Sequence, residues 1–153
     1  MSSSRHVVPD AGAMRDLGAS VASSCVAGDI VLLIGPLGAG KTTFTQGLAR
    51  GLGVAGAVTS PTFVIAREHV AVNDGPGLVH VDAYRLGGLH ELDDLDLDSS
   101  LAGSVTAVEW GQGLAEHLGG AVIRVVIERA CGEREGDPLD ARVVTVEWPE
   151  GRP

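Results

Sequence analysis

Five consecutive apolar residues lead directly into a glycine-rich turn and then into a helix-like stretch. The apolar run is Ile30–Ile34, IVLLI, and the residues after it read GPLGAGKTTF. An uninterrupted apolar run of this length is typical of a strand that is covered on both faces. Because the strand runs through a tight turn into a helix carrying Phe44 and Leu48, it restricts the chain to α/β architectures.

The turn matches the P-loop pattern Gly-x-x-x-x-Gly-Lys-Thr. Its glycines let the backbone wrap a phosphate chain with N–H groups pointing inward, and the start of the helix adds the positive end of its dipole. Lys41 is the one lysine among eleven basic residues. A compact ammonium fits beside the β- and γ-phosphates, where a planar guanidinium does not. The pattern predicts a nucleotide site formed by Gly35, Gly38, Ala39, Gly40, Lys41, Thr42 and Thr43.

Two strand-like segments end in an acid that could serve the metal of this site. Asp82 ends LVHVD and Glu109 ends SVTAVE. Ligands of open α/β sheets lie at the carboxyl ends of parallel strands, so either acid could be the Walker B group beside the Thr42 hydroxyl. Arg85 follows in the same turn as Asp82. It could neutralise phosphate charge or pair with a surface acid, and the sequence does not separate these two roles.

The remaining segments complete the expected order of elements. Asp10 is expected to cap a helix in which Met14, Leu17, Val21 and Cys25 share a buried stripe, so Cys25 is expected to be a core residue and not a nucleophile. The turn signal NDGPG at 73–77 separates two strand-like runs and predicts an antiparallel hairpin. Strands are expected at 30–34, 63–72, 78–84, 104–110, 121–129 and 142–148. The sequence therefore predicts a three-layer α/β P-loop NTPase fold with a mixed, mainly parallel sheet and edge hairpins.

Composition limits size, partners and location. The chain has 153 residues, 44% of them apolar, which suits one domain over residues 1–153. The net charge is −9 and the ten arginines are scattered, so unaided binding to DNA or tRNA is not expected. The cysteines form no zinc or disulfide pattern, the first residues lack the apolar core of a signal peptide, and no apolar run has membrane-spanning length. We expect a soluble, cytoplasmic protein with no membrane contact.

Five segments in order resemble the bacterial TsaE family, the P-loop ATPase of tRNA threonylcarbamoyladenosine (t6A) biosynthesis. They read GPLGAGKTTFTQGLARGLG, VTSPTFVI, HVDAYRL, EL at 91–92, and VEWGQ. The P-loop alone occurs in many families, whereas the SPTF, HxDxYR and EW elements in this order are far more specific. The resemblance covers most of residues 8–115 and implies ATP and Mg²⁺ as cofactors. Slow hydrolysis that depends on a partner is expected on a separate ground, because the sequence shows no glutamine in a water-positioning place near the switch-like loop.

The resemblance also implies roles for individual residues and for other proteins. Lys41, Asp82 and Glu109 would be the catalytic set, Mg²⁺ would be held by Thr42 and Glu109 with Asp82 at the same site, and Thr62 would lie in a switch-like loop. ATP would also contact Ala11 and Arg142. The implied partner is a complex of TsaB- and TsaD-type proteins that modifies adenosine 37 of tRNAs reading ANN codons, so tRNA is reached only indirectly.

Several alternatives stay open at this level. The segment 86–98, LGGLHELDDLDLD, is either an amphipathic helix lining the core or a docking surface for the partner, and Trp110 is either a core aromatic or a reporter of the nucleotide state. A small-molecule kinase shares the P-loop but needs a lid that this chain does not offer. A scaffold that binds ATP with negligible hydrolysis has the same motifs, because a hydrolysis rate cannot be inferred from them.

Overall fold

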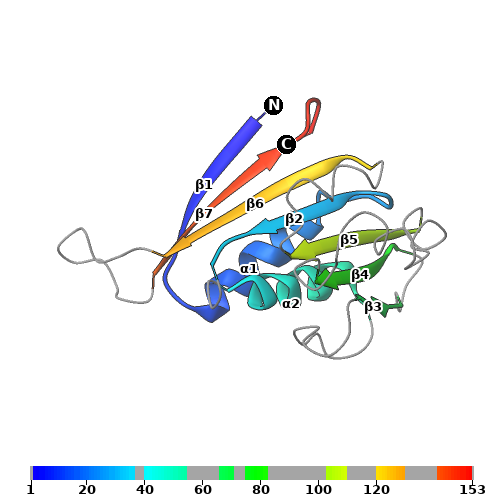
Figure 1. The fold of residues 1–153 in the computed structure, drawn as a ribbon, viewed down its shortest axis with the longest axis horizontal. Helices are drawn as coiled ribbons and strands as arrows, with labels where there is room; N and C mark the ends of the chain where they lie inside the picture. Colours follow the sequence, from blue (N-terminus) through cyan, green and yellow to red (C-terminus); the bar gives the residue numbers. More distant parts are fainter. Residues whose placement is uncertain are drawn as a thin grey trace.

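The fold is described from a computed structural model, which describes residues 2–36, 40–54, 66–70, 75–82, 103–109, 120–129 and 141–152. These residues form one sheet and two helices (Figure 1). In chain order the elements are β1 (Ser2–Val8), α1 (Ala11–Ala22), β2 (Ile30–Ile34), α2 (Lys41–Leu52), β3 (Ala66–His69), β4 (Gly77–Asp82), β5 (Ser104–Glu109), β6 (Val122–Arg129) and β7 (Arg142–Trp148).

The sheet has a parallel centre and antiparallel edges. Its seven strands lie in the order β1-β7-β6-β2-β5-β4-β3, and the four neighbours β6, β2, β5 and β4 are parallel. Strands β3 and β4 form one antiparallel edge pair, and β6, β7 and β1 form the other edge. The predicted mixed sheet is confirmed, including the hairpin around the turn at 73–77 and the C-terminal hairpin of β6 and β7.

Both faces of the central strands are buried, as a three-layer arrangement requires. Along β2, Val31 and Leu33 join the core that contains α1 and α2, and Ile30 and Leu32, on the opposite face, are equally inaccessible. Helices α1 and α2 lie side by side on one face of the sheet (Figure 1). The helices come close because Gly47 has no side chain: a Cβ atom there would lie 2.0 Å from the Arg15 carbonyl oxygen.

Helix α1 begins as predicted and ends earlier than predicted. The Asp10 carboxylate accepts a hydrogen bond from the Ala13 amide at 2.8 Å, which caps the first turn. The helix ends at Ala22, so the prediction that Cys25 lies in its buried stripe is wrong. Ser23 donates its hydroxyl hydrogen to the Ser20 carbonyl at 2.6 Å, a local bond that competes with the helix ladder. Cys25 nevertheless packs against the core, as expected of a structural thiol.

Strand β1 was not expected from the sequence. Its residues pair with β7 along their full length, from Ser2 beside Trp148 to Val8 beside Arg142. The two chain ends therefore lie close together (Figure 1). Neither helix in the described part of the chain is long and apolar enough to cross a membrane.

Candidate nucleotide site

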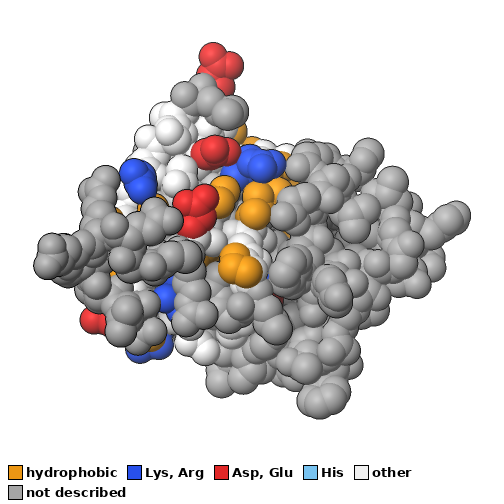
Figure 2. Space-filling model, turned by 60° about the vertical axis from the view of Figure 1, so that its left-hand side comes forward, with side chains coloured by type: hydrophobic (Ala, Val, Ile, Leu, Met, Phe, Trp, Pro, Cys, Tyr) orange, Lys and Arg blue, Asp and Glu red, His pale blue; other side chains and the backbone are white. Residues whose placement is uncertain are grey.

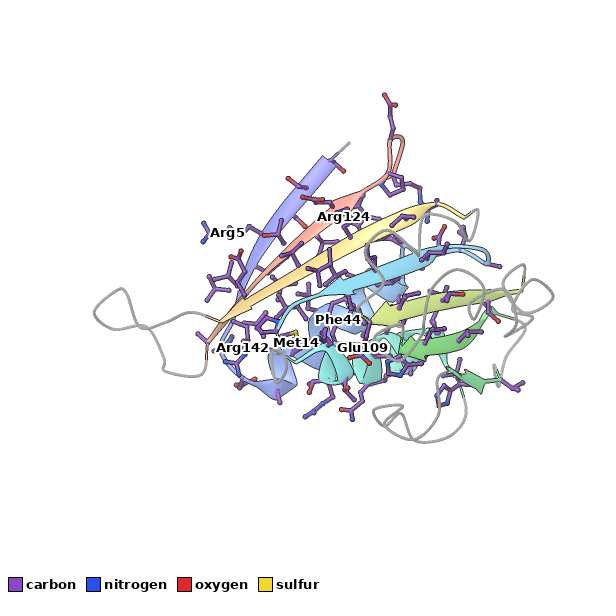
Figure 3. All side chains as sticks on the ribbon, viewed as in Figure 1. Arg5, Met14, Phe44, Glu109, Arg124 and Arg142 are labelled. Carbon is purple, nitrogen blue, oxygen red and sulfur yellow. The ribbon has the colours of Figure 1, made fainter. Side chains whose placement is uncertain are left out.

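One edge of the sheet collects the residues that the sequence singles out. Strands β2, β5 and β4 end there at Ile34, Glu109 and Asp82. Strand β7, which runs the other way, begins at the same edge, and β1 ends there just before α1. Figure 3 labels Glu109, Met14 and Arg142, which are spread along this edge. The carboxyl edge of a parallel sheet is where α/β proteins bind ligands.

The P-loop passes from β2 into α2 at this edge. Gly40 caps α2 with φ +111°, a conformation that side-chain-bearing residues rarely adopt. The first hydrogen bond of the helix is donated by the Phe44 amide to the Gly40 carbonyl, at 2.9 Å. The amides that precede Phe44 in the first turn therefore have no carbonyl partner within the helix. Backbone N–H groups at a helix start, reinforced by the helix dipole, form a site for anions.

Lys41 is buried at the mouth of the loop. Its residue is 5% exposed, and its ammonium nitrogen donates a hydrogen bond to the Gly35 carbonyl oxygen at 2.7 Å. This bond joins the first and last parts of the loop. Burying an ammonium is costly unless it is paired or hydrogen-bonded. The position therefore concentrates positive charge beside the start of α2, which suits the β- and γ-phosphates of a nucleotide.

The strand register decides which acid lies nearer the P-loop. Glu109 pairs with Leu33 of β2, one residue before that strand ends. Asp82 pairs with Glu109 and so lies one strand further away, at about 4.8 Å per strand. The Asp82 side chain lies outside what the structure describes. Glu109 is buried, and its Oε2 lies 2.7 Å from Nε2 of His80.

His80 is a site residue to which sequence analysis gave no role, although it is the first residue of the HxDxYR element. Its side chain is 0% exposed and lies on β4, two residues before Asp82 and on the same face of the sheet. The register places it beside Ala107, so it points toward the side from which Glu109 projects. The alternation in HVD already puts His80 and Asp82 on one face. The contact with Glu109 also requires knowing that β4 pairs with β5 in parallel, which the sequence does not state.

The start of α1 and the start of β7 meet at the same edge. Arg142 pairs with Val8, three residues before Ala11, so these two predicted ATP contacts lie near one another. Arg142 is partly buried. Met14 of α1 reaches the P-loop, because a Cβ atom on Gly40 would lie 3.1 Å from the Met14 methyl carbon. The first turn of α1 is thus part of the wall beside the P-loop.

Other predicted positions fall outside the described residues. They are Gly38 and Ala39 of the P-loop, Thr62, Arg85, the segment 86–98 and Trp110. Thr42 and Thr43 occupy the first turn of α2, as the pattern requires. No group of three or more histidine, cysteine or acidic side chains that could hold a metal comes together in the described part of the chain.

The donor set nevertheless fits Mg²⁺ carried by a nucleotide. Mg²⁺ at phosphates is usually bound through one or two carboxylates, phosphate oxygens and waters, and does not need a cage of protein ligands. Glu109 offers one buried carboxylate, and Thr42 offers a hydroxyl at the start of α2. On the face drawn in Figure 2, the acidic and basic side chains of the described residues are scattered, and the basic ones form no stripe.

Comparison with known proteins identifies relatives over most of the chain. The family model for threonylcarbamoyl adenosine biosynthesis protein TsaE matches residues 8–137. A tRNA threonylcarbamoyladenosine biosynthesis protein TsaE from Streptomyces coelicolor is 62% identical over 121 residues, which is 78% of this chain and 82% of the relative. The Bacillus subtilis protein of the same name is 47% identical over 105 residues, 67% of this chain and 63% of the relative.

A solved structure shares the fold. The crystal structure of YdiB from Bacillus subtilis superposes with a TM-score of 0.70 at 33% sequence identity. The match covers 95% of this chain and 84% of YdiB.

Proposed function

The chain belongs to the TsaE family of threonylcarbamoyl adenosine biosynthesis proteins, and on that premise we propose that it binds ATP with Mg²⁺ and hydrolyses the ATP slowly in support of tRNA t6A formation. The family places the protein in t6A biosynthesis. The nucleotide, the metal and the hydrolysis are our proposal. The observation that carries the proposal is the buried Lys41 ammonium at the mouth of a P-loop that leads into α2.

The P-loop would hold the phosphates of the nucleotide. The starts of α1 and β7 would contact its ribose and base. The amides that start α2 and the Lys41 ammonium supply donors for the β- and γ-phosphates. Thr43 follows on the α-phosphate side. Ala11 and Arg142 flank the same edge and are the candidates for contacts with ribose or base. Gly38, Ala39 and Thr62, outside the described residues, complete the proposed set.

Thr42 and Glu109 are the residues that would hold Mg²⁺. The bound cation would offset the charge of the phosphate oxygens. Strand order favours Glu109 over Asp82 as the direct ligand, since β5 and not β4 is the neighbour of β2. We therefore expect Glu109→Gln to raise the Mg²⁺ concentration needed for nucleotide binding more than Asp82→Asn does. Mg²⁺ titrations with a fluorescent ATP analogue measure this, and the reverse order would transfer the ligand role to Asp82.

We base the slow hydrolysis on a group that the described residues do not bring to the mouth of the loop, a glutamine that could position water. Fast P-loop enzymes add a residue that positions water and an arginine that meets the charge of the transition state. Gln46 lies in α2, beyond the loop, and Gln112 lies outside the described residues. A partner that supplies or orders the missing group could accelerate turnover roughly 10³-fold. The partner we propose is the t6A-forming complex of TsaB- and TsaD-type proteins, with tRNA reached through it.

Phosphate release tests the proposal directly. ATP turnover of the pure protein is measured first, and the TsaB- and TsaD-type proteins are then added with and without tRNA. We expect slow turnover alone and a clear increase with the complex. The Lys41→Ala variant should lose turnover while keeping its fold, because Lys41 lies at the loop and not in the apolar core. Nucleotide binding without phosphate release in any mixture would instead support a nucleotide-gated scaffold.

Coupling to the partner gives a second readout in the same experiment. If ATP binds more tightly in the complex, the complex must bind more tightly to the ATP-loaded protein by the same factor. Affinity of the protein for the complex is therefore measured with ADP and with a non-hydrolysable ATP analogue. Equal affinities, together with an unchanged hydrolysis rate, would contradict partner-dependent turnover.

A further inference from the structure

We infer that His80 is a positioning residue for Glu109: it fixes one carboxylate oxygen so that the other is presented to the metal of the nucleotide. This inference rests on the proposed function and adds to it a residue outside the P-loop and outside the pair of acids. Its basis is the hydrogen bond of 2.7 Å between Nε2 of His80 and Oε2 of Glu109, where the His80 side chain is 0% and the Glu109 side chain 8% exposed.

The chemistry of the pair assigns the direction of this bond. A carboxylate that binds a cation must be ionised, and an ionised carboxylate only accepts hydrogen bonds. Nε2 of His80 must then carry the hydrogen and donate it to Oε2. The bond occupies Oε2 and leaves Oε1 for the metal. A glutamate side chain has three rotatable bonds, and their conformational entropy is lost when the carboxylate binds a metal. A hydrogen bond that already fixes one oxygen reduces this entropy cost of metal binding.

The second ring nitrogen shows that the histidine is poorly explained as a core residue. Nδ1 of His80 is buried and makes no hydrogen bond within the described structure. Its neighbours along β4, Leu78, Val79 and Val81, are buried and apolar. An apolar residue would fill such a position without leaving a buried polar atom unpaired. Among the described residues, the one polar interaction of the ring is therefore the contact with Glu109.

The strand register explains why the position of this contact matters. His80 and Glu109 lie on neighbouring parallel strands, and Glu109 is also beside Leu33, at the end of β2. His80 thus holds the carboxylate from the side away from the P-loop. A partner on that side leaves the side facing β2 open to the nucleotide. Outer partners of metal ligands typically change metal affinity by about 10–100-fold when they are removed.

Two amide substitutions separate positioning from simple packing. In His80→Gln the side-chain nitrogen reaches as far as Nε2, whereas in His80→Asn it stops near Nδ1 and cannot reach Glu109. Thr106→Val is the control, because Thr106 is buried on the adjacent strand with a hydroxyl that makes no hydrogen bond in the described structure. Binding of a fluorescent ATP analogue is titrated with Mg²⁺, and is also measured in EDTA.

We expect His80→Asn to raise the half-saturating Mg²⁺ concentration about 10-fold, with the affinity in EDTA unchanged. His80→Gln should recover most of the loss, and Thr106→Val should behave as the unmodified protein. The positioning role would be overturned if the half-saturating Mg²⁺ concentration rose equally in the two amide variants, or in neither. A parallel loss of affinity in EDTA would also overturn it. If the unmodified protein shows no Mg²⁺-dependent gain in affinity, the proposed function itself fails, which is a different result.

Nuclear magnetic resonance of the unmodified protein keeps the inference testable if His80→Asn does not fold. The Nε2–H proton of His80, identified by its loss in His80→Gln, should resonate far downfield because it is donated to a carboxylate. It should move when Mg²⁺ and the nucleotide are added, since Glu109 then gives charge to the cation. A signal that is unchanged on adding both would overturn the inference.

Discussion

Replacing Gly40 by alanine tests whether the backbone of the P-loop, and not merely the presence of Lys41, makes the site. Gly40 has φ +111° and Gly28, in the turn before β2, has φ +94°. An alanine at either position is forced into the left-handed region, which costs roughly 1–2 kcal/mol. A Cβ atom added at Gly40 lies 3.1 Å from the Met14 methyl carbon, whereas a Cβ atom added at Gly28 has no neighbour within 4 Å. Since methionine adapts easily, strain dominates at both sites.

The two variants should therefore lose similar stability and differ in nucleotide binding. A loss of 1–2 kcal/mol in a domain of this size lowers the melting temperature by about 2–8 °C. Nucleotide at 100 times its Kd adds about 2.7 kcal/mol, or about 5–10 °C, to the unmodified protein. Gly28→Ala should keep this increase. Gly40→Ala relieves its strain by turning the first amides of α2 away from the phosphates, and losing one charge-assisted bond lowers affinity about tenfold or more.

Thermal unfolding with and without Mg²⁺ and ATP measures both quantities on the same samples. A tenfold weaker Kd leaves about half of the nucleotide-induced increase at the same ATP concentration. The decisive comparison is the size of that increase in the two variants, because their melting temperatures without nucleotide are expected to be similar. If Gly40→Ala keeps the full increase, the backbone geometry at Gly40 is not what binds the phosphates, and the first amides of α2 are not their donors.

Two further predictions concern groups outside the site. Arg152→Met should lower the free energy of unfolding by roughly 3 kcal/mol, because it leaves the Asp29 carboxylate, 3% exposed, without its ion-pair partner. The control Arg50→Met removes an exposed ion pair worth less than about 1 kcal/mol. Equal losses of the two variants in chemical denaturation would contradict this prediction. Burial, aided by the nearby Asp29 charge, raises the pKa of the Cys25 thiol to about 12 from 9.0. In a Cys131→Ser background, alkylation of Cys25 at pH 8 should therefore be far slower in the folded than in the unfolded protein. The free energy of unfolding should fall as pH rises from about 9 toward about 12, because only the unfolded thiol is ionised in that range.

The sequence predicts elements best where burial leaves a strong pattern. The run at 30–34 is a strand with those bounds, and the strand at 142–148 is also confirmed. The first is a continuous apolar run, and the second alternates apolar and polar residues; both patterns are typical of strands. The glycine-rich turn at 73–77 correctly indicated a hairpin, because glycine and proline mark turns by their backbone limits. These signals are local, so one sequence is enough to detect them.

Features that depend on long-range pairing were not predictable in the same way. The stretch SSSRHVV has mostly exposed residues and becomes a strand through its backbone pairing with β7, about 140 residues away. The ion pair of Asp29 with Arg152 likewise joins the turn before β2 to the C-terminal end of the chain. The contact of His80 with Glu109 follows only once β4 is placed beside β5. In each case the residues are ordinary until the topology brings them together.

The strand order itself explains why chemistry concentrates at one edge. A crossover from β2 to its parallel neighbours returns the chain to the same direction, so the segments that leave Ile34, Asp82 and Glu109 all begin at that edge. Strand β6 ends there too, and β7 starts there, because a hairpin reverses direction where it turns. The edge thus gathers the P-loop, two acids and Arg142 from four strands, β2, β4, β5 and β7. Within it, only β5 and β6 flank β2 directly, and of these β5 ends in the acid. The topology places Glu109 on the strand next to β2, which supports it as the proposed metal ligand. It also places His80 of β4 beside this carboxylate, in the positioning role that we propose.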